Sequence, residues 1–234
     1  MRTLLASLIV CSSLIACADD APATDAGVDA ADAATDAPID AAGPCGADFF
    51  LTGAYEDLDS TSTAFDGVEF ATWTVRGEPT RTVTTNPNGR VELCIAAGRD
   101  SVIDATQSDY LPAIYVAHPE VFAAPGLFFF QVKGVKTTRL APFLADLGIA
   151  ADPARGHVLV QQQGTARALA LTGGGAPFAA DDSDDTTWTA GSTGGLVLFT
   201  NVSVGTATLS TTGPIVGATA LPVEAGALTI TTIR

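Results

Sequence analysis

Short runs of residues in which apolar or β-branched side chains alternate with polar ones fill the sequence from Phe49 onward. Glycine, proline, asparagine and aspartate separate these runs. Alternation with a period of two places the apolar side chains of a strand on one face, and frequent turn residues keep strands short. We therefore predict an all-β fold of the sandwich type. The predicted strands are 49–55, 68–75, 80–84, 90–95, 101–105, 113–117, 128–132, 157–162, 167–171, 186–189, 195–199, 206–210 and 228–232.

The segment from Thr84 to Val91 carries the clearest hairpin pattern in the chain. Pro87 fixes φ for a turn, the Asn88-Gly89 pair accepts positive φ, and alternation resumes directly afterwards. This predicts a hairpin between the strands 80–84 and 90–95.

A different periodicity interrupts the strands between residues 138 and 152. Leu140, Phe143, Leu144 and Leu147 recur at helical spacing, with Pro142 at an early position and a glycine, residue 148, at the end. We predict a short helix that joins two β units. Its apolar stripe is expected to cover a sheet edge or the junction between the units, and the alternative is a groove for a partner.

The sequence before the strands has two different compositions. Arg2 precedes an apolar stretch that is too short for the ~20 residues needed to cross a bilayer and suits a signal peptide. The stretch ends Leu-Ile-Ala-Cys at 14–17, which resembles the bacterial lipobox, so we predict that Cys17 accepts lipid and anchors the chain to a membrane. We favour the outer membrane or cell surface over the inner membrane. The alternative is an ordinary secretory signal with a chance cysteine.

Residues 18–42 contain seven aspartates, no lysine or arginine, and almost no bulky side chains. Such a segment cannot bury enough apolar surface to offset its chain entropy, so we predict a disordered acidic tether. The whole chain has 26 acidic and 11 basic residues and a formal net charge of −15. This charge argues against nucleic-acid binding, which needs basic patches.

Two of the four cysteines lie in the predicted leader and two in or just before the predicted strands. Cys11 leaves with the signal peptide and Cys17 carries the lipid, which leaves Cys45 and Cys94. An exported chain with one remaining pair is expected to form a disulfide, here between Cys45 and Cys94. The predicted organisation is a signal peptide at 1–16, a tether at 17–44, a β unit at 45–137, a helical connector at 138–152 and a second β unit at 153–234.

Two runs resemble a known family. The run TTNPNGRVEL at 84–93, followed by Gly98 and by Tyr-Leu-Pro at 110–112, resembles the carboxypeptidase regulatory-like, or transthyretin-like, β-sandwich. The run STGGLVLF at 192–199, followed by Gly205, is similar. The resemblance implies two tandem Greek-key (immunoglobulin-like or transthyretin-like) sandwich units, of a kind displayed on bacterial surfaces or appended to enzymes. It speaks to the fold more than to an activity.

Few residues with the chemistry for catalysis are present. The two histidines, His118 and His157, are isolated in the sequence, neither has the spacing of a zinc motif, and no G-x-S-x-G nucleophile motif occurs. We therefore predict no catalytic residues and no enzyme. The alternative is a pair of carboxylates that acts on a glycosidic bond.

Two further segments each allow two interpretations. Asp181, Asp182, Asp184 and Asp185 form an acidic loop that is either solvated, without a cofactor, or a weak Ca²⁺ site, because Ca²⁺ takes several carboxylate oxygens. The aromatic run at 128–130 either fills the core or exposes Phe129 as part of a ligand or partner patch.

Together these features predict a lipid-anchored, non-catalytic binding or structural module that recognises a protein or a glycan. A calcium-stabilised adhesin is the alternative.

Overall fold

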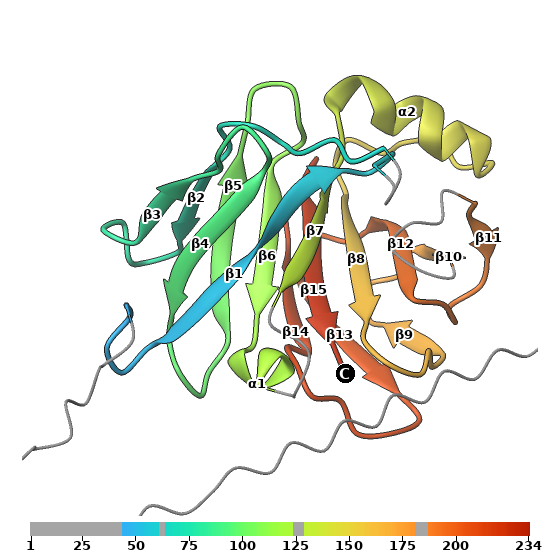
Figure 1. Cartoon of the computed structure of the whole chain (residues 1–234). Helices are drawn as coiled ribbons and strands as arrows, with labels where there is room; N and C mark the ends of the chain where they lie inside the picture. The colour runs from blue at the N-terminus through green and yellow to red at the C-terminus, as the bar shows by residue number, and fades with distance from the viewer. Residues whose placement is uncertain (1–43, 61–63, 124–128, 181–186) are drawn as a thin grey trace, which may run out of the picture. The chain divides into compact units, whose positions relative to one another are not determined.

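The computed structural model describes residues 44–60, 64–123, 129–180 and 187–234 (Figure 1). The predicted signal peptide, Cys17 and all but the last residue of the predicted tether lie outside these ranges, as do the four aspartates of the acidic loop. The described residues form fifteen strands and two short helices, which confirms the all-β prediction. The elements are β1(Phe49–Asp57), β2(Thr72–Val75), β3(Thr82–Thr84), β4(Arg90–Ile95), β5(Ser101–Thr106), β6(Ala113–Ala117), α1(Pro119–Phe122), β7(Phe130–Gly134), α2(Thr137–Asp146), β8(Gly156–Gln162), β9(Leu169–Leu171), β10(Ala176–Ala180), β11(Thr189–Ala190), β12(Leu196–Val202), β13(Gly205–Thr211), β14(Ala220–Val223) and β15(Leu228–Ile233).

A nine-stranded sheet runs through the described chain in the order β11-β10-β12-β8-β15-β6-β5-β2-β3. β15 lies at its centre and pairs in parallel with β8 on one side and with β6 on the other. Two three-stranded sheets accompany it, β4-β1-β7 and β14-β13-β9. Strands from both ends of the sequence thus share one sheet.

The two small sheets cover opposite faces of the large one. Tyr115 of β6 and Leu159 of β8 pack in a first core, while their neighbours Ile114 and Val158 pack in a second. The small sheets complete the two cores, the first with Leu51, Val91 and Val132 and the second with Leu169, Leu209 and Leu221. Because the central strands are covered on both faces, every residue of β15 and β8 is buried, including the threonines of β15 and the glutamines of β8.

The predicted division into two tandem Greek-key units is not confirmed. β6 precedes the predicted boundary at 138–152 and β8 follows it, yet both pair with β15. The described residues accordingly belong to one compact unit. Sequence alternation assigns residues to strands and faces, but it does not state which strands become neighbours.

A short helix, α2, lies where the connector 138–152 was predicted; it begins at Thr137 and has Pro142 inside it. The predicted role of this helix as a link between two units is not confirmed. Gly148 ends it at positive φ (74°). The Gly148 N–H donates to the Ala145 carbonyl (2.9 Å) and the Ile149 N–H to the Leu144 carbonyl (2.8 Å), which is the Schellman arrangement. Phe143 and Leu144 are buried in the first core, so α2 packs on the face of the large sheet.

The predicted hairpin at Asn86–Gly89 is wrong in one respect. The turn forms: the Gly89 N–H donates to the Asn86 carbonyl (2.8 Å), and Gly89 has φ 70°. The strands on its two sides do not pair, because β3 belongs to the large sheet and β4 to the small sheet β4-β1-β7. The turn therefore carries the chain from one layer to the next.

The predicted disulfide between Cys45 and Cys94 is confirmed (S–S 2.01 Å). It joins the segment before β1 to β4, the strand that pairs with β1. It closes a loop of 49 residues, for which a contribution of about 2–4 kcal/mol to the free energy of unfolding is expected.

Candidate functional site

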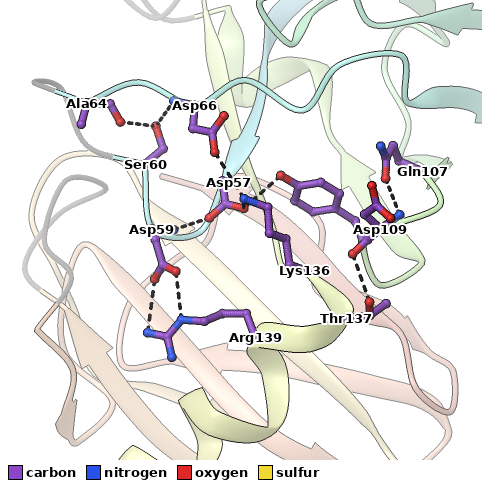
Figure 2. Close-up of polar contacts among 11 residues, drawn as sticks. Asp57, Asp59, Ser60, Ala64, Asp66, Gln107, Asp109, Lys136, Thr137 and Arg139 are labelled. Atoms are coloured by element: carbon purple, nitrogen blue, oxygen red, sulfur yellow. Dashed lines mark hydrogen bonds and ion pairs between the residues drawn. The ribbon is translucent and has the colours of Figure 1, made fainter.

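A cluster of polar side chains lies where β1 ends (Figure 2). Asp57, the last residue of β1, is 4% exposed and its carboxylate accepts hydrogen bonds from the Tyr110 hydroxyl (2.9 Å) and the Asp59 N–H (2.9 Å). Lys136 Nζ lies 3.0 Å from the same carboxylate. The three partners come from the loop after β1, the loop before β6 and the residue before α2, so Asp57 joins segments far apart in the sequence.

A second set of contacts extends this cluster onto α2. Arg139 contacts the Asp59 carboxylate through two nitrogens (2.9 and 3.4 Å). Thr137 donates from its backbone N–H (2.8 Å) and its hydroxyl (3.2 Å) to the Asp109 carbonyl. The first turn of α2 is thereby fixed against the loops on both sides (Figure 2).

A buried ion pair lies next to this cluster. Glu56 of β1 and Lys133 of β7 are opposite each other in the parallel register, and each is 3% exposed. Lys133 Nζ is 3.2 Å from the Glu56 carboxylate and donates a hydrogen bond to the Ser60 carbonyl (2.9 Å). The Ser60 hydroxyl donates to Glu56 (3.3 Å). The loop after β1 therefore closes over two charges that were in water in the unfolded chain.

The side chains in and beside the cluster whose pKa is raised keep their protons at neutral pH. Burial, and secondly the hydrogen bond to Asp57, raises the pKa of Tyr110 to about 12. The hydrogen bond to Asp57 raises the pKa of Lys136, and burial raises the pKa of Tyr55. A lysine and two tyrosines that stay protonated are poor nucleophiles and poor bases. Tyr110 and Lys136 instead donate to Asp57 and hold the loops and α2 in place, while Tyr55 packs its ring against Trp73 and Tyr110.

The two histidines lie in separate environments. His118, after β6, has Nδ1 2.6 Å from Asp100 and Nε2 3.7 Å from Glu120. His157, in β8, is 2% exposed, and its Nδ1 accepts from the Asn201 N–H (3.4 Å). Within the described ranges, no group of three or more histidine, cysteine, aspartate or glutamate side chains is arranged to hold a metal ion.

The buried His157 should make stability depend on pH. Burial lowers its pKa below the ordinary 6.5, so below that pH the unfolded chain binds a proton that the folded chain refuses. The free energy of unfolding should therefore fall as the pH drops below 6.5, by at most about 1.4 kcal/mol per pH unit from this group. Urea unfolding between pH 7.5 and 5.5, compared with His157→Gln, measures this contribution. An identical pH dependence in the variant would contradict the assignment.

Aromatic side chains are exposed on the outer face of the sheet β4-β1-β7. Phe50 of β1 is 40% exposed and Phe129, just before β7, is 44% exposed. The register places Gly53 opposite Phe130, so continuing it by one residue places Thr52 opposite Phe129. Phe50 precedes Thr52 by two residues and shares its face. We call Phe50 and Phe129 the aromatic face.

Each exposed ring of the aromatic face has a neighbour that points inward. Phe130 is 1% exposed and packs in the first core, and Phe49 packs against the same core. The alternation expected within the run 128–130 is thus confirmed for Phe129 and Phe130, while Phe128 lies outside the described residues. Because the inner rings fill the core, the outer rings are held on a fixed scaffold.

Comparison with protein-family models, with curated proteins and with solved structures finds no match to this chain. The resemblance to the carboxypeptidase regulatory-like sandwich stays a prediction. In the described part of the chain, neither helix has the length and apolar character that crossing a membrane requires.

Proposed function

We propose that this chain is a membrane-anchored, non-catalytic binding module that recognises a protein or a glycan at a bacterial surface or in the periplasm. The aromatic face carries this proposal. Exposed aromatic side chains on an otherwise polar surface commonly mark contact sites, because they bury a large apolar area with few rotatable bonds.

The setting of the two rings supports a recognition role. Thr52 lies between them along the register, and Glu92 of β4 is opposite Thr52. A ligand on this face would meet apolar rings together with the exposed Glu92 carboxylate, and such a mixture of apolar and polar groups is typical of interfaces with partners that also exist free in water. Because β1 pairs with both β4 and β7, the rings would change position little on binding.

The anchor is part of the same proposal and rests on the sequence. A leader that ends at Cys17, followed by an acidic segment without bulky residues, would attach the chain to a membrane and hold the β-rich part away from it. Metabolic labelling with palmitate tests this: label on the chain that is absent from Cys17→Ser supports the anchor, and equal label on both chains contradicts it.

Replacing both rings of the aromatic face should abolish ligand capture without unfolding the protein. The variant Phe50→Ser/Phe129→Ser is expected to lose at least tenfold in affinity for its ligand, while its stability changes by about 0.5 kcal/mol or less, because neither ring is in the core. Retention of cell-wall glycans and of surface proteins on the immobilised full-length chain provides the measurement.

The matched control is Val204→Ser, an exposed apolar residue (56%) in the turn between β12 and β13. Capture that is lost in the double variant and retained in this control supports the proposal. Capture that survives in the double variant, or the absence of any captured glycan or protein, contradicts it.

A further inference from the structure

Two arginines differ from every other cation that the structure describes. Each of the other lysines and arginines in the described ranges lies within 4.0 Å of a carboxylate. Arg167 and Arg234 instead contact backbone carbonyls, at Pro214 (2.5 Å) and Glu120 (3.5 Å). In a chain with 26 acidic and 11 basic residues, carboxylate partners are plentiful, so two guanidinium groups without one are unexpected.

Both arginines line the same surface depression. It has a volume of about 840 Å³ including the solvent at its mouth, and Gln163 and Thr165 also line it. None of the side chains that line it is acidic. A second depression, beside β5, provides a contrast: Arg76 and Arg99 line it, but so do Glu78 and Asp100, and its charges are balanced.

The backbone holds both arginines in place. The buried Gln162 side chain accepts from the Arg167 N–H (3.1 Å) and donates to the Arg167 carbonyl (2.8 Å). Arg234 and Val216 exchange two backbone hydrogen bonds of 2.9 Å. Arg234 contacts the backbone carbonyl of Glu120, whereas the Glu120 side-chain carboxylate lies 3.7 Å from His118 Nε2. Each guanidinium carries five N–H donors, so most donors on both arginines have no protein acceptor.

We propose that this depression, the arginine depression, binds the carboxylate of an acidic glycan. Arginine matches a carboxylate with two parallel hydrogen bonds, and two such groups with no acidic side chain in the lining outweigh the single backbone carboxylate of Arg234 and give a local positive potential. The Thr165 hydroxyl and the Gln163 amide supply neutral partners for sugar hydroxyls. The depression is open rather than enclosed, which suits one sugar within a polymer. This inference does not depend on the aromatic face.

A titration with an oligomer of galacturonic acid tests the proposal on the full-length chain. Isothermal calorimetry and the backbone amide shifts of Gly164 and Thr165 report binding and its location. We expect binding that weakens as ionic strength rises, since the recognition is largely electrostatic. The same oligomer with methyl-esterified carboxyl groups should bind at least tenfold more weakly. An oligomer of glycerol phosphate, titrated in the same way, tests whether the depression binds phosphate groups in place of carboxylates.

The variants Arg167→Gln and Arg234→Gln should each weaken binding of the oligogalacturonate at least fivefold. Arg90→Gln is the matched control, because Arg90 is an exposed arginine that pairs with Glu92 (3.2 Å). The proposal is supported if oligogalacturonate binding weakens in Arg167→Gln and Arg234→Gln and is retained in Arg90→Gln and Phe129→Ser. Equal binding of the esterified oligomer, binding of the phosphate oligomer alone, or no shift at Gly164 would overturn it.

Discussion

Lys133→Met is expected to lower the free energy of unfolding by about 3–5 kcal/mol. Lys133 and Glu56 are both 3% exposed, and their ion pair (3.2 Å) lies beneath the loop that follows β1. Removing the ammonium leaves the Glu56 carboxylate in a site with little water, where an unpaired charge is very costly. The Ser60 carbonyl loses its hydrogen-bond donor in the same variant. Urea unfolding at neutral pH, followed by circular dichroism, measures the loss.

Two further variants separate the cost of an unpaired charge from the loss of packing. Glu56→Gln/Lys133→Met removes both charges and should recover much of the stability lost in the single variant, because buried ion pairs contribute little beyond a well-packed neutral pair. Arg90→Met is the exposed control, because the side chains of Arg90 and of its partner Glu92 are 55% and 51% exposed, and it should cost about 1 kcal/mol or less. A Lys133→Met loss no larger than that of this control would contradict the burial of the pair.

Ile230→Ala should destabilise both halves of the described chain together. Ile230 is in β15 and 1% exposed, and it packs in the first core at the centre of the large sheet. Truncation of a buried isoleucine costs about 2–5 kcal/mol because a cavity remains. Since β15 pairs with β6 and with β8, the loss should appear wherever unfolding is observed.

The two tryptophans provide separate reporters for this test. Trp73 is buried in β2, and Trp188 packs against Phe143 of α2, with ring centroids 5.8 Å apart. In the Trp188→Phe background the fluorescence comes from Trp73, and in the Trp73→Phe background it comes from Trp188. The free energy of unfolding is measured in each background with and without Ile230→Ala, so the effect of the tryptophan substitution cancels. Equal losses at both reporters support one shared sheet. A loss at one reporter alone would favour two independent units.

Local patterns in the sequence predicted many of the strands but not their neighbours. The bounds predicted for β4 and β6 agree with the structure, because polar and apolar residues alternate in β4 and β6 is a β-branched apolar run between turn residues. The same pattern predicted a strand where β15 lies, and nothing in it indicated that this strand would pair with β6 and β8. Pairing depends on long-range packing that no window of the sequence contains.

Elements with atypical composition escaped prediction. β10 reads APFAA and β14 reads ALPV, and alanine and proline are disfavoured in strands. Both strands form because neighbouring strands and the cores hold them. α1 begins at Pro119, a residue that suits the first position of a helix, but its four residues were indistinguishable from a turn.

The candidate sites were predictable to different extents. Alternation within the aromatic run allowed an exposed Phe129, and the structure places that ring at the surface. The cluster around Asp57 was not predictable, since its partners Tyr110 and Lys136 are more than fifty residues away in the sequence. One signal was present: Glu56 and Lys133 each follow a buried apolar residue within a predominantly apolar strand, and buried charges are usually paired.

The central place of β15 has a consequence for biosynthesis. The chain leaves the ribosome with its N-terminus first, and β15 follows the fourteen other strands of the described residues. Until residues 228–233 have emerged, β6 and β8 lack the partner that joins them, so the large sheet cannot close strand by strand as the polypeptide grows. We therefore expect a nascent chain that has not yet emitted residues 228–233 to remain incompletely folded, with β6 and β8 unpaired on the sides that β15 will occupy.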